Sequence, residues 1–137
     1  MKNNNENENK IPNREEIPLE FRWDIQSLYS SLEEWEEDCQ RTKKLADELL
    51  KYKDSFTEEA TSFIKCLQSR DKILDLAHQV YTYAHMRKDE DNNDTQNQSI
   101  YNKASSLLVE IEDSLSFIQP GILSLNAKTI GKWIAEN

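Results

Sequence analysis

An apolar helical pattern that runs into an acidic, asparagine-rich turn constrains this chain more than any other feature. From Ile73 to Met86, apolar side chains recur at spacings of three and four and cover a face wide enough for a buried helix. The pattern ends in residues 88–94, KDEDNND, where carboxylates oppose a helix C-terminus and asparagines favour a turn. A second apolar stripe runs from Thr95 to about Ile118, with Asp94 as its natural N-cap. These two segments predict an antiparallel helix pair.

A further helix is predicted ahead of this pair, because a capping box opens an apolar stripe. Ser31 and Glu34 have the spacing at which the hydroxyl satisfies an orphan amide and the carboxylate reaches back to the cap. The stripe that follows has helical spacing and consists of Leu32, Trp35, Cys39, Thr42, Ala46 and Leu49. A break is expected at residues 53–56, after which Thr57 caps a shorter helix, with a bend or a restart at residues 68–71.

The C-terminal part contains a Pro-Gly pair and one more amphipathic segment. Pro120 and Gly121 are expected to end the second helix of the pair, and residues 122–125 to form a short helical turn. Asn126 then caps a final segment whose apolar residues are Ile130, Trp133 and Ile134. Because this segment has no evident partner in the sequence, we expect an incomplete domain that is truncated at its C-terminal end.

The N-terminal part is expected to be a tail followed by an arm. Residues 1–13 are mainly Asn, Glu and Lys, which cannot offset the entropy of being ordered, and they predict a disordered polar tail. Pro12 and Pro18 push the residues before them towards an extended conformation, which predicts an extended arm. Five large apolar residues of this arm lie within nine positions, and we expect them to cover the helical body: Phe21, Trp23, Ile25, Leu28 and Tyr29.

The scarcity of helix breakers favours a single all-α domain. Only two Gly and three Pro occur in 137 residues, whereas a β-sandwich needs a breaker between every pair of strands. A chain of this length is expected to build one core. The sequence therefore predicts an antiparallel, bundle-like helical lobe of about five helices within residues 14–137, preceded by the Pro-containing arm.

Charge and hydropathy limit the partners of the chain. The formal net charge is −9 and the isoelectric point about 4.7, so the average surface repels phosphate backbones and anionic lipids. We therefore expect no nucleic-acid partner and no membrane partner. The first residues have no apolar leader, and a run of about 18 apolar residues occurs nowhere. A soluble, cytoplasmic protein is the resulting expectation.

The two histidines have the wrong spacing for a shared metal ion. His78 and His85 stand seven positions apart, which places them on one helix face but about 10.5 Å apart along the axis. A metallopeptidase helix instead carries HExxH, so that two histidines reach one zinc ion while the Glu activates water. This motif does not occur here. A metal-binding helical protein that uses His78 or His85 stays open as the least favoured interpretation.

The remaining candidates for chemistry also favour structural roles. The acidic run at residues 89–94 lacks the glycine and the terminal glutamate of a calcium-binding EF-hand loop, since Asp94 and Ile100 occupy those positions. No serine lies in a GxSxG or glycine-rich phosphate motif. Cys39 and Cys66 read as small buried hydrophobes, with a disulfide left open. We therefore assign no catalytic, cofactor-binding or metal residue within this chain.

Three stretches, in this order, resemble the N-terminal part of oligoendopeptidase F, in the thimet-oligopeptidase-like superfamily of zinc peptidases. The first is REEIPLEFRWDIQSLYSSLEEWEED at residues 14–38, with its Ile-Pro arm, Trp-Asp turn and Trp-bearing helix. The second is VYTYAHMRKDEDNND at residues 80–94, and the third is ASSLLVEIEDSLSFIQPGILSL at residues 104–125. Residues 14–137 are covered, and the polar tail is unmatched.

The resemblance implies a mostly helical, two-lobed enzyme that hydrolyses short peptides with a zinc ion held by an HExxH helix and a distal glutamate. In that family the N-terminal helices wall a deep substrate channel. This chain would contribute to the wall, would be inactive by itself, and would have the remaining catalytic lobe and an oligopeptide substrate as partners. The alternative is a stand-alone helical interaction module without enzymatic activity, which would bind a partner helix through Ile130, Trp133 and Ile134.

Overall fold

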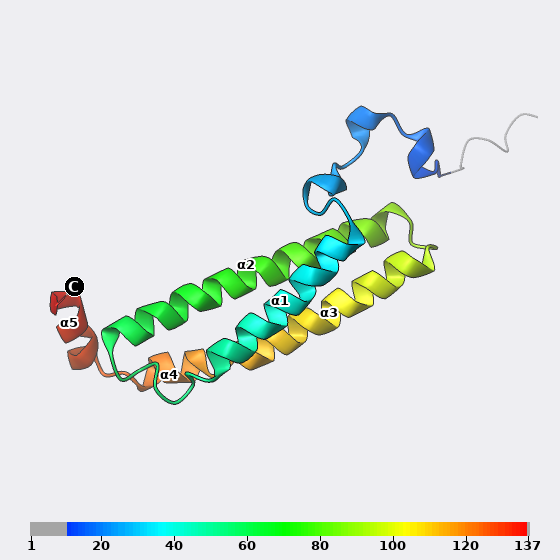
Figure 1. Cartoon of the computed structure of the whole chain (residues 1–137). Helices are drawn as coiled ribbons and strands as arrows, with labels where there is room; N and C mark the ends of the chain where they lie inside the picture. The colour runs from blue at the N-terminus through cyan, green and yellow to red at the C-terminus, as the bar shows by residue number, and fades with distance from the viewer. Residues whose placement is uncertain (1–10, 137) are drawn as a thin grey trace, which may run out of the picture.

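The computed structural model describes residues 11–136, and within them all regular secondary structure is helical (Figure 1). Three short 3₁₀ turns come first: η1 (Arg14–Glu16), η2 (Leu19–Phe21) and η3 (Ile25–Ser27). Five α-helices follow: α1 (Leu32–Leu50), α2 (Ala60–Glu90), α3 (Thr95–Leu115), α4 (Ile118–Ser124) and α5 (Ala127–Glu136). The predicted all-α class and helix number are confirmed. Most of the predicted tail, residues 1–10, lies outside the described residues.

The long helices α1, α2 and α3 pack against one another as a rod-shaped bundle (Figure 1). The helices α2 and α3 form the antiparallel pair that the sequence predicts, joined by the acidic turn. Asp94 caps α3 as predicted, because its carboxylate accepts hydrogen bonds from the amides of Gln96 at 2.7 Å and Asn97 at 3.2 Å. The hydroxyl of Ser31 likewise accepts the amide of Glu34 at 3.2 Å and starts α1. The other half of the predicted capping box differs, because the Glu34 carboxylate accepts the amide of Ser30 at 3.0 Å and not that of Ser31.

The predicted stripes of α1 and α3 form the core together with one face of α2. Trp35 is 3% exposed, and its indole N–H donates to the Val80 carbonyl at 3.0 Å, which ties α1 to the middle of α2. The Tyr29 and Tyr83 rings meet edge to face beside it. The other buried apolar residues of the three helices are Cys39, Ala46, Leu49, Cys66, Ile73, Ala77, Ala84, Ile100, Ala104, Leu107, Ile111 and Leu115.

The start and the continuity of α2 differ from the prediction. Thr57 does not cap a helix: residues 51–59 form turns, and α2 begins at Ala60 with Glu59 at the N-cap position. The helix is then continuous through residues 68–71, so it does not restart there. Burial explains both differences. Phe56 is buried in the core, and its packing fixes the turns before α2. Cys66 and Ile73, seven positions apart, continue one buried stripe across the polar segment.

The sequence predicted that the Pro-Gly pair would end a helix. In the structure the pair instead lies inside α4. The helix α3 ends at Leu115, and Pro120 falls in the first turn of α4, where its missing amide hydrogen is not needed. Gly121 faces Phe56, whose ring packs edge to face on Phe117 at 5.4 Å between centroids and stacks with Phe63 at 6.2 Å. Close packing by this ring therefore accounts for the glycine.

The arm is partly folded and covers less of the body than predicted. Ile17, before Pro18, is extended as expected, but 3₁₀ turns occupy much of the arm. Ile25 and Tyr29 are buried against the bundle, at 3% and 5% exposure. The aromatic residues Phe21 and Trp23 instead stay largely exposed, at 73% and 55%. The arm that carries them projects from the bundle near the end where α2 turns into α3 (Figure 1). The prediction that these two rings dock on the body is wrong.

The helix α5 lies at the opposite end of the rod (Figure 1). Asn126 caps it as predicted, accepting the amide of Thr129 at 2.8 Å. The Trp133 ring packs against Phe63 at 5.5 Å between centroids, whereas Ile134 is 74% exposed. No helix among residues 11–136 has the length and apolar character needed to cross a bilayer.

Candidate functional site

The two histidines lie on one face of α2 but are not brought to a common ligand. His78 is exposed. His85, one turn before the helix end, places Nδ1 3.1 Å from Asp89 Oδ2. Across residues 11–136, no group of three or more His, Cys, Asp or Glu side chains gathers as a metal ion requires. The described residues therefore do not fit the zinc ion that the resemblance implies for the whole protein.

His85 belongs instead to an aromatic cluster between α2 and α3. The Tyr81 and Tyr101 hydroxyls are 3.4 Å apart, and the His85 ring lies 5.7 Å and 5.5 Å from these two rings. The Lys88 ammonium lies 4.1 Å from the centre of the Tyr101 ring, a cation–π distance. The hydrogen bond between the hydroxyls raises the pKa of Tyr81 and lowers the pKa of Tyr101. The cluster thereby joins the two helices near their turn.

The carboxylates of the acidic turn are used to build the turn. Asp91 accepts the amide of Asn93 at 2.9 Å, and Asp94 is the cap of α3. Glu90 is paired with Arg14 of the arm, which leaves its side chain 12% exposed. These hydrogen bonds and the ion pair give the acidic run a structural role, as the sequence favoured over calcium binding.

A groove of about 570 Å³ runs between the N-terminal halves of α1 and α3. Its apolar floor comes from Leu32, Trp35 and Ile100, and acidic residues of α1 line its edge. Glu36 is bridged to Lys103 at 2.6 Å, which lowers the pKa of Glu36. Such a groove, apolar below and acidic at the rim, can hold an aliphatic or cationic stretch of peptide. The sequence pattern predicted that these residues lie on two helices. It did not predict that the two helix faces meet to form a groove.

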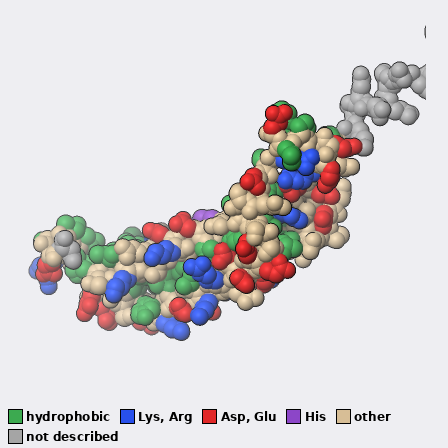
Figure 2. Space-filling view, turned by 45° about the horizontal axis from the view of Figure 1, so that its top comes forward, with side chains coloured by type: hydrophobic (Ala, Val, Ile, Leu, Met, Phe, Trp, Pro, Cys, Tyr) green, Lys and Arg blue, Asp and Glu red, His purple; other side chains and the backbone are tan. Residues whose placement is uncertain are grey.

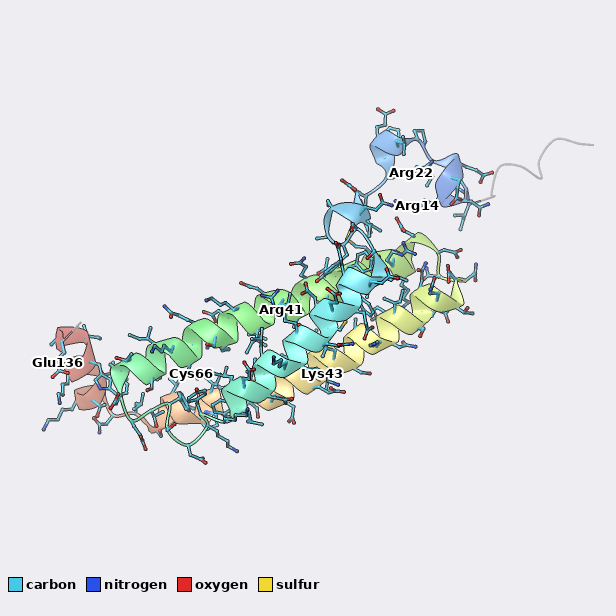
Figure 3. All side chains as sticks on the ribbon, in the orientation of Figure 1. Arg14, Arg22, Arg41, Lys43, Cys66 and Glu136 are labelled. Atoms are coloured by element: carbon cyan, nitrogen blue, oxygen red, sulfur yellow. The ribbon has the colours of Figure 1, made fainter. Side chains whose placement is uncertain are left out.

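A second hollow, of about 420 Å³, lies between the arm and the end of α2 and is lined by three arginines. Figure 3 shows Arg14 and Arg22 on the arm side of this region. Arg14 donates from Nη2 to the Trp23 carbonyl at 3.1 Å, and Arg22 donates from Nε to the Ile17 carbonyl at 2.6 Å. Arg87 donates from Nε to Asn97 Oδ1 at 3.3 Å. The first two arginines set the shape of the arm.

The cysteines are buried and free, in agreement with the reading of both as small hydrophobes. Burial raises the pKa of the Cys39 thiol to about 12 and also raises the pKa of Cys66. Both thiols are therefore protonated near neutral pH, which disfavours a nucleophilic role because the thiolate is the reactive form.

Comparison with known proteins relates the chain to a group of bacterial peptidases. No family model matches it. "Oligopeptidase PepF" of Bacillus subtilis is 30% identical over 128 residues, which cover 93% of this chain and 19% of that protein. "Oligoendopeptidase F, chromosomal" of Lactococcus lactis subsp. cremoris is 29% identical over 126 residues, or 90% of this chain and 21% of that protein.

A solved structure shares the fold as well. The crystal structure of oligoendopeptidase-F from Enterococcus faecium superposes with a TM-score of 0.70 at 25% identity, covering 78% of this chain and 21% of that one. The resemblance seen in the sequence is therefore confirmed. The chain spans about one fifth of the length of the relatives that it matches.

Proposed function

Because this chain is a relative of oligoendopeptidase F along nine tenths of its length, we propose that it is the N-terminal helical lobe of a zinc-dependent oligopeptidase. The observation that carries the proposal is the difference between two coverages of the alignment, that of this chain and that of each relative. The match covers nearly the whole chain but only about a fifth of each relative. Such a chain would act as one part of a larger peptidase that hydrolyses short peptides.

Within that protein the lobe would help to wall the substrate channel. Its long, three-helix rod offers an extended surface, and the groove between α1 and α3 gives that surface an apolar floor with an acidic edge. The zinc ion and the groups that activate water would belong to the remaining catalytic lobe, since this chain has no HExxH motif. The cytoplasmic location expected from the sequence is part of the same proposal.

A chimera tests this function directly. The 128 matched residues of the Bacillus subtilis relative are replaced by the corresponding part of this chain, and hydrolysis of short fluorogenic peptides is measured. We expect the chimera to cleave these peptides, whereas the relative without the segment loses activity. The isolated chain, supplied with zinc, is expected to stay at the background rate.

Two outcomes would contradict the proposal. A chimera that folds but hydrolyses no peptide, beside an active parent protein, would show that this chain does not replace the segment. Zinc-dependent peptide hydrolysis by the isolated chain would show that catalysis does not need the remaining part. A parent carrying an equally long, unrelated helical segment is the matched control.

A further inference from the structure

The arm presents three large apolar side chains to water at one end of the rod. Leu19, Phe21 and Trp23 are 79%, 73% and 55% exposed, and we refer to them as the arm tip. Enclosed aromatic side chains bury roughly 150–250 Å² each, so the two rings leave roughly 200–300 Å² of their surface in water. Trp and Phe so exposed on a projection are typical of a binding surface, whereas packing within the bundle would have covered them.

The arm tip is held on a defined frame. Arg22 bridges two carbonyls of the arm, donating from Nε to Ile17 at 2.6 Å and from Nη2 to Glu15 at 2.9 Å. Arg14 donates to the Trp23 carbonyl and is also ion-paired with Glu90 of α2. Because these bonds fix the arm before any partner arrives, less conformational entropy is lost when the tip is covered.

The rim of the arm tip is acidic. Glu15, Glu20 and Asp24 are exposed, and among residues 11–136 none of these three carboxylates has a cationic partner within ion-pair distance. Figure 2 shows acidic side chains at the top and along the sides of the projection, apolar ones beside them and a group of basic side chains in its middle. The complementary surface is therefore an apolar pocket with lysine or arginine at its edge.

We propose that the arm tip docks into such a basic-rimmed apolar pocket on the remaining part of the same oligopeptidase. This inference rests on the proposed function. The relatives are about five times as long as this chain, so a large surface of the same polypeptide is available to cover the tip. A stable interface covers roughly 800 Å² per partner, so the rings form its centre and the acidic rim its periphery.

The chimera described above tests the docking through a triple variant, Leu19→Ser, Phe21→Ser and Trp23→Ser. Val109→Ser is the matched control, because Val109 on α3 is also exposed, at 65%. In the isolated chain we expect both variants to keep the wild-type melting temperature. In the chimera the tip variant should shorten the half-life of peptidase activity at elevated temperature by roughly tenfold or more, as the loss of an interface hot spot does. Val109→Ser should leave that half-life unchanged.

The possible failures are distinguishable. An active chimera in which the tip variant and Val109→Ser have equal half-lives would overturn the docking while leaving the proposed function intact. A chimera without activity overturns the proposed function itself. Dimerisation of the isolated chain in sedimentation experiments, abolished by the tip variant, would overturn the docking in favour of a second copy as the occupant.

Charge reversal by Glu20→Lys is expected to shorten the half-life of peptidase activity in the chimera and to leave the melting temperature of the isolated chain unaffected.

Discussion

Substitution of Gly121 by alanine should strongly destabilise the fold, although alanine is the better helix former. A Cβ atom at this position in α4 would lie 2.7 Å from Phe56 Cε1 and closer still to Cζ. The Phe56 ring is 2% exposed and is held by the Phe63 and Phe117 rings, so it has no free space to move into. The new methyl group must therefore displace part of the core.

The expected magnitude follows from three contributions. Overpacking costs about 1–3 kcal/mol. Loss of the two ring contacts of Phe56 costs about 0.5–1.5 kcal/mol each. The higher helix propensity of alanine offsets about 1 kcal/mol. The three contributions combine to a net loss of about 1–5 kcal/mol in the free energy of unfolding. Its centre, about 3 kcal/mol, corresponds to a fall of roughly 10 °C in Tm for a chain of this size.

Thermal unfolding followed by circular dichroism measures this loss, and Gly131→Ala is the matched control. A Cβ atom at Gly131 in α5 would meet nothing within 4 Å, so this variant should keep or slightly raise Tm. In a Phe56→Leu background, Gly121→Ala should cost much less, because the outer ring atoms are gone. Equal melting temperatures for Gly121→Ala and Gly131→Ala would refute the packing argument.

Three further predictions concern the bundle. Ile111→Asp should abolish cooperative unfolding, because it buries an unpaired charge at a position that is 1% exposed. Lys103→Asp removes only the half-exposed ion pair with Glu36. It should lower the free energy of unfolding in urea by at most about 1 kcal/mol. Asp94→Ala should cost about 1 kcal/mol, since α3 loses its N-cap; an unchanged urea midpoint would contradict that role. Burial raises the pKa of the Cys39 thiol to about 12, so the folded chain keeps a proton that the unfolded chain releases above about pH 9. The free energy of unfolding should therefore fall as pH rises from about 9 towards 12. Cys39→Ala should remove up to about 1.4 kcal/mol per pH unit from this slope.

The sequence was most informative where local chemistry and tertiary packing agree. The caps at Ser31, Asp94 and Asn126 and the stripes of α1 and α3 are fixed by hydrogen bonds and spacings within a few residues, and the structure confirms them. The position of Phe56 depends instead on rings from α2 and α4. No local pattern contains those distant contacts, so the start of α2 was misplaced.

The candidate site shows the same division. Spacing alone separated His78 from His85 as metal ligands, and the family resemblance came from short motifs that lie in order along the chain. The groove between α1 and α3, the cluster of Tyr81 with Tyr101, and the exposed arm tip all depend on how separate segments meet in space. The rings of Phe21 and Trp23 were expected to be buried, because large apolar side chains usually are. Residues of a binding surface are an exception to that tendency.

The attachment of α5 has a consequence for the order in which the molecule opens. The Trp133 ring lies on Phe63, while Ile134 faces water, so the helix adds little buried apolar surface to the rod. Its amide protons should therefore exchange with solvent through a local opening of low free energy, while those around Val80, beneath the Trp35 indole, exchange only when the whole bundle unfolds. The chain would then behave as a firm three-helix unit with a separately melting end.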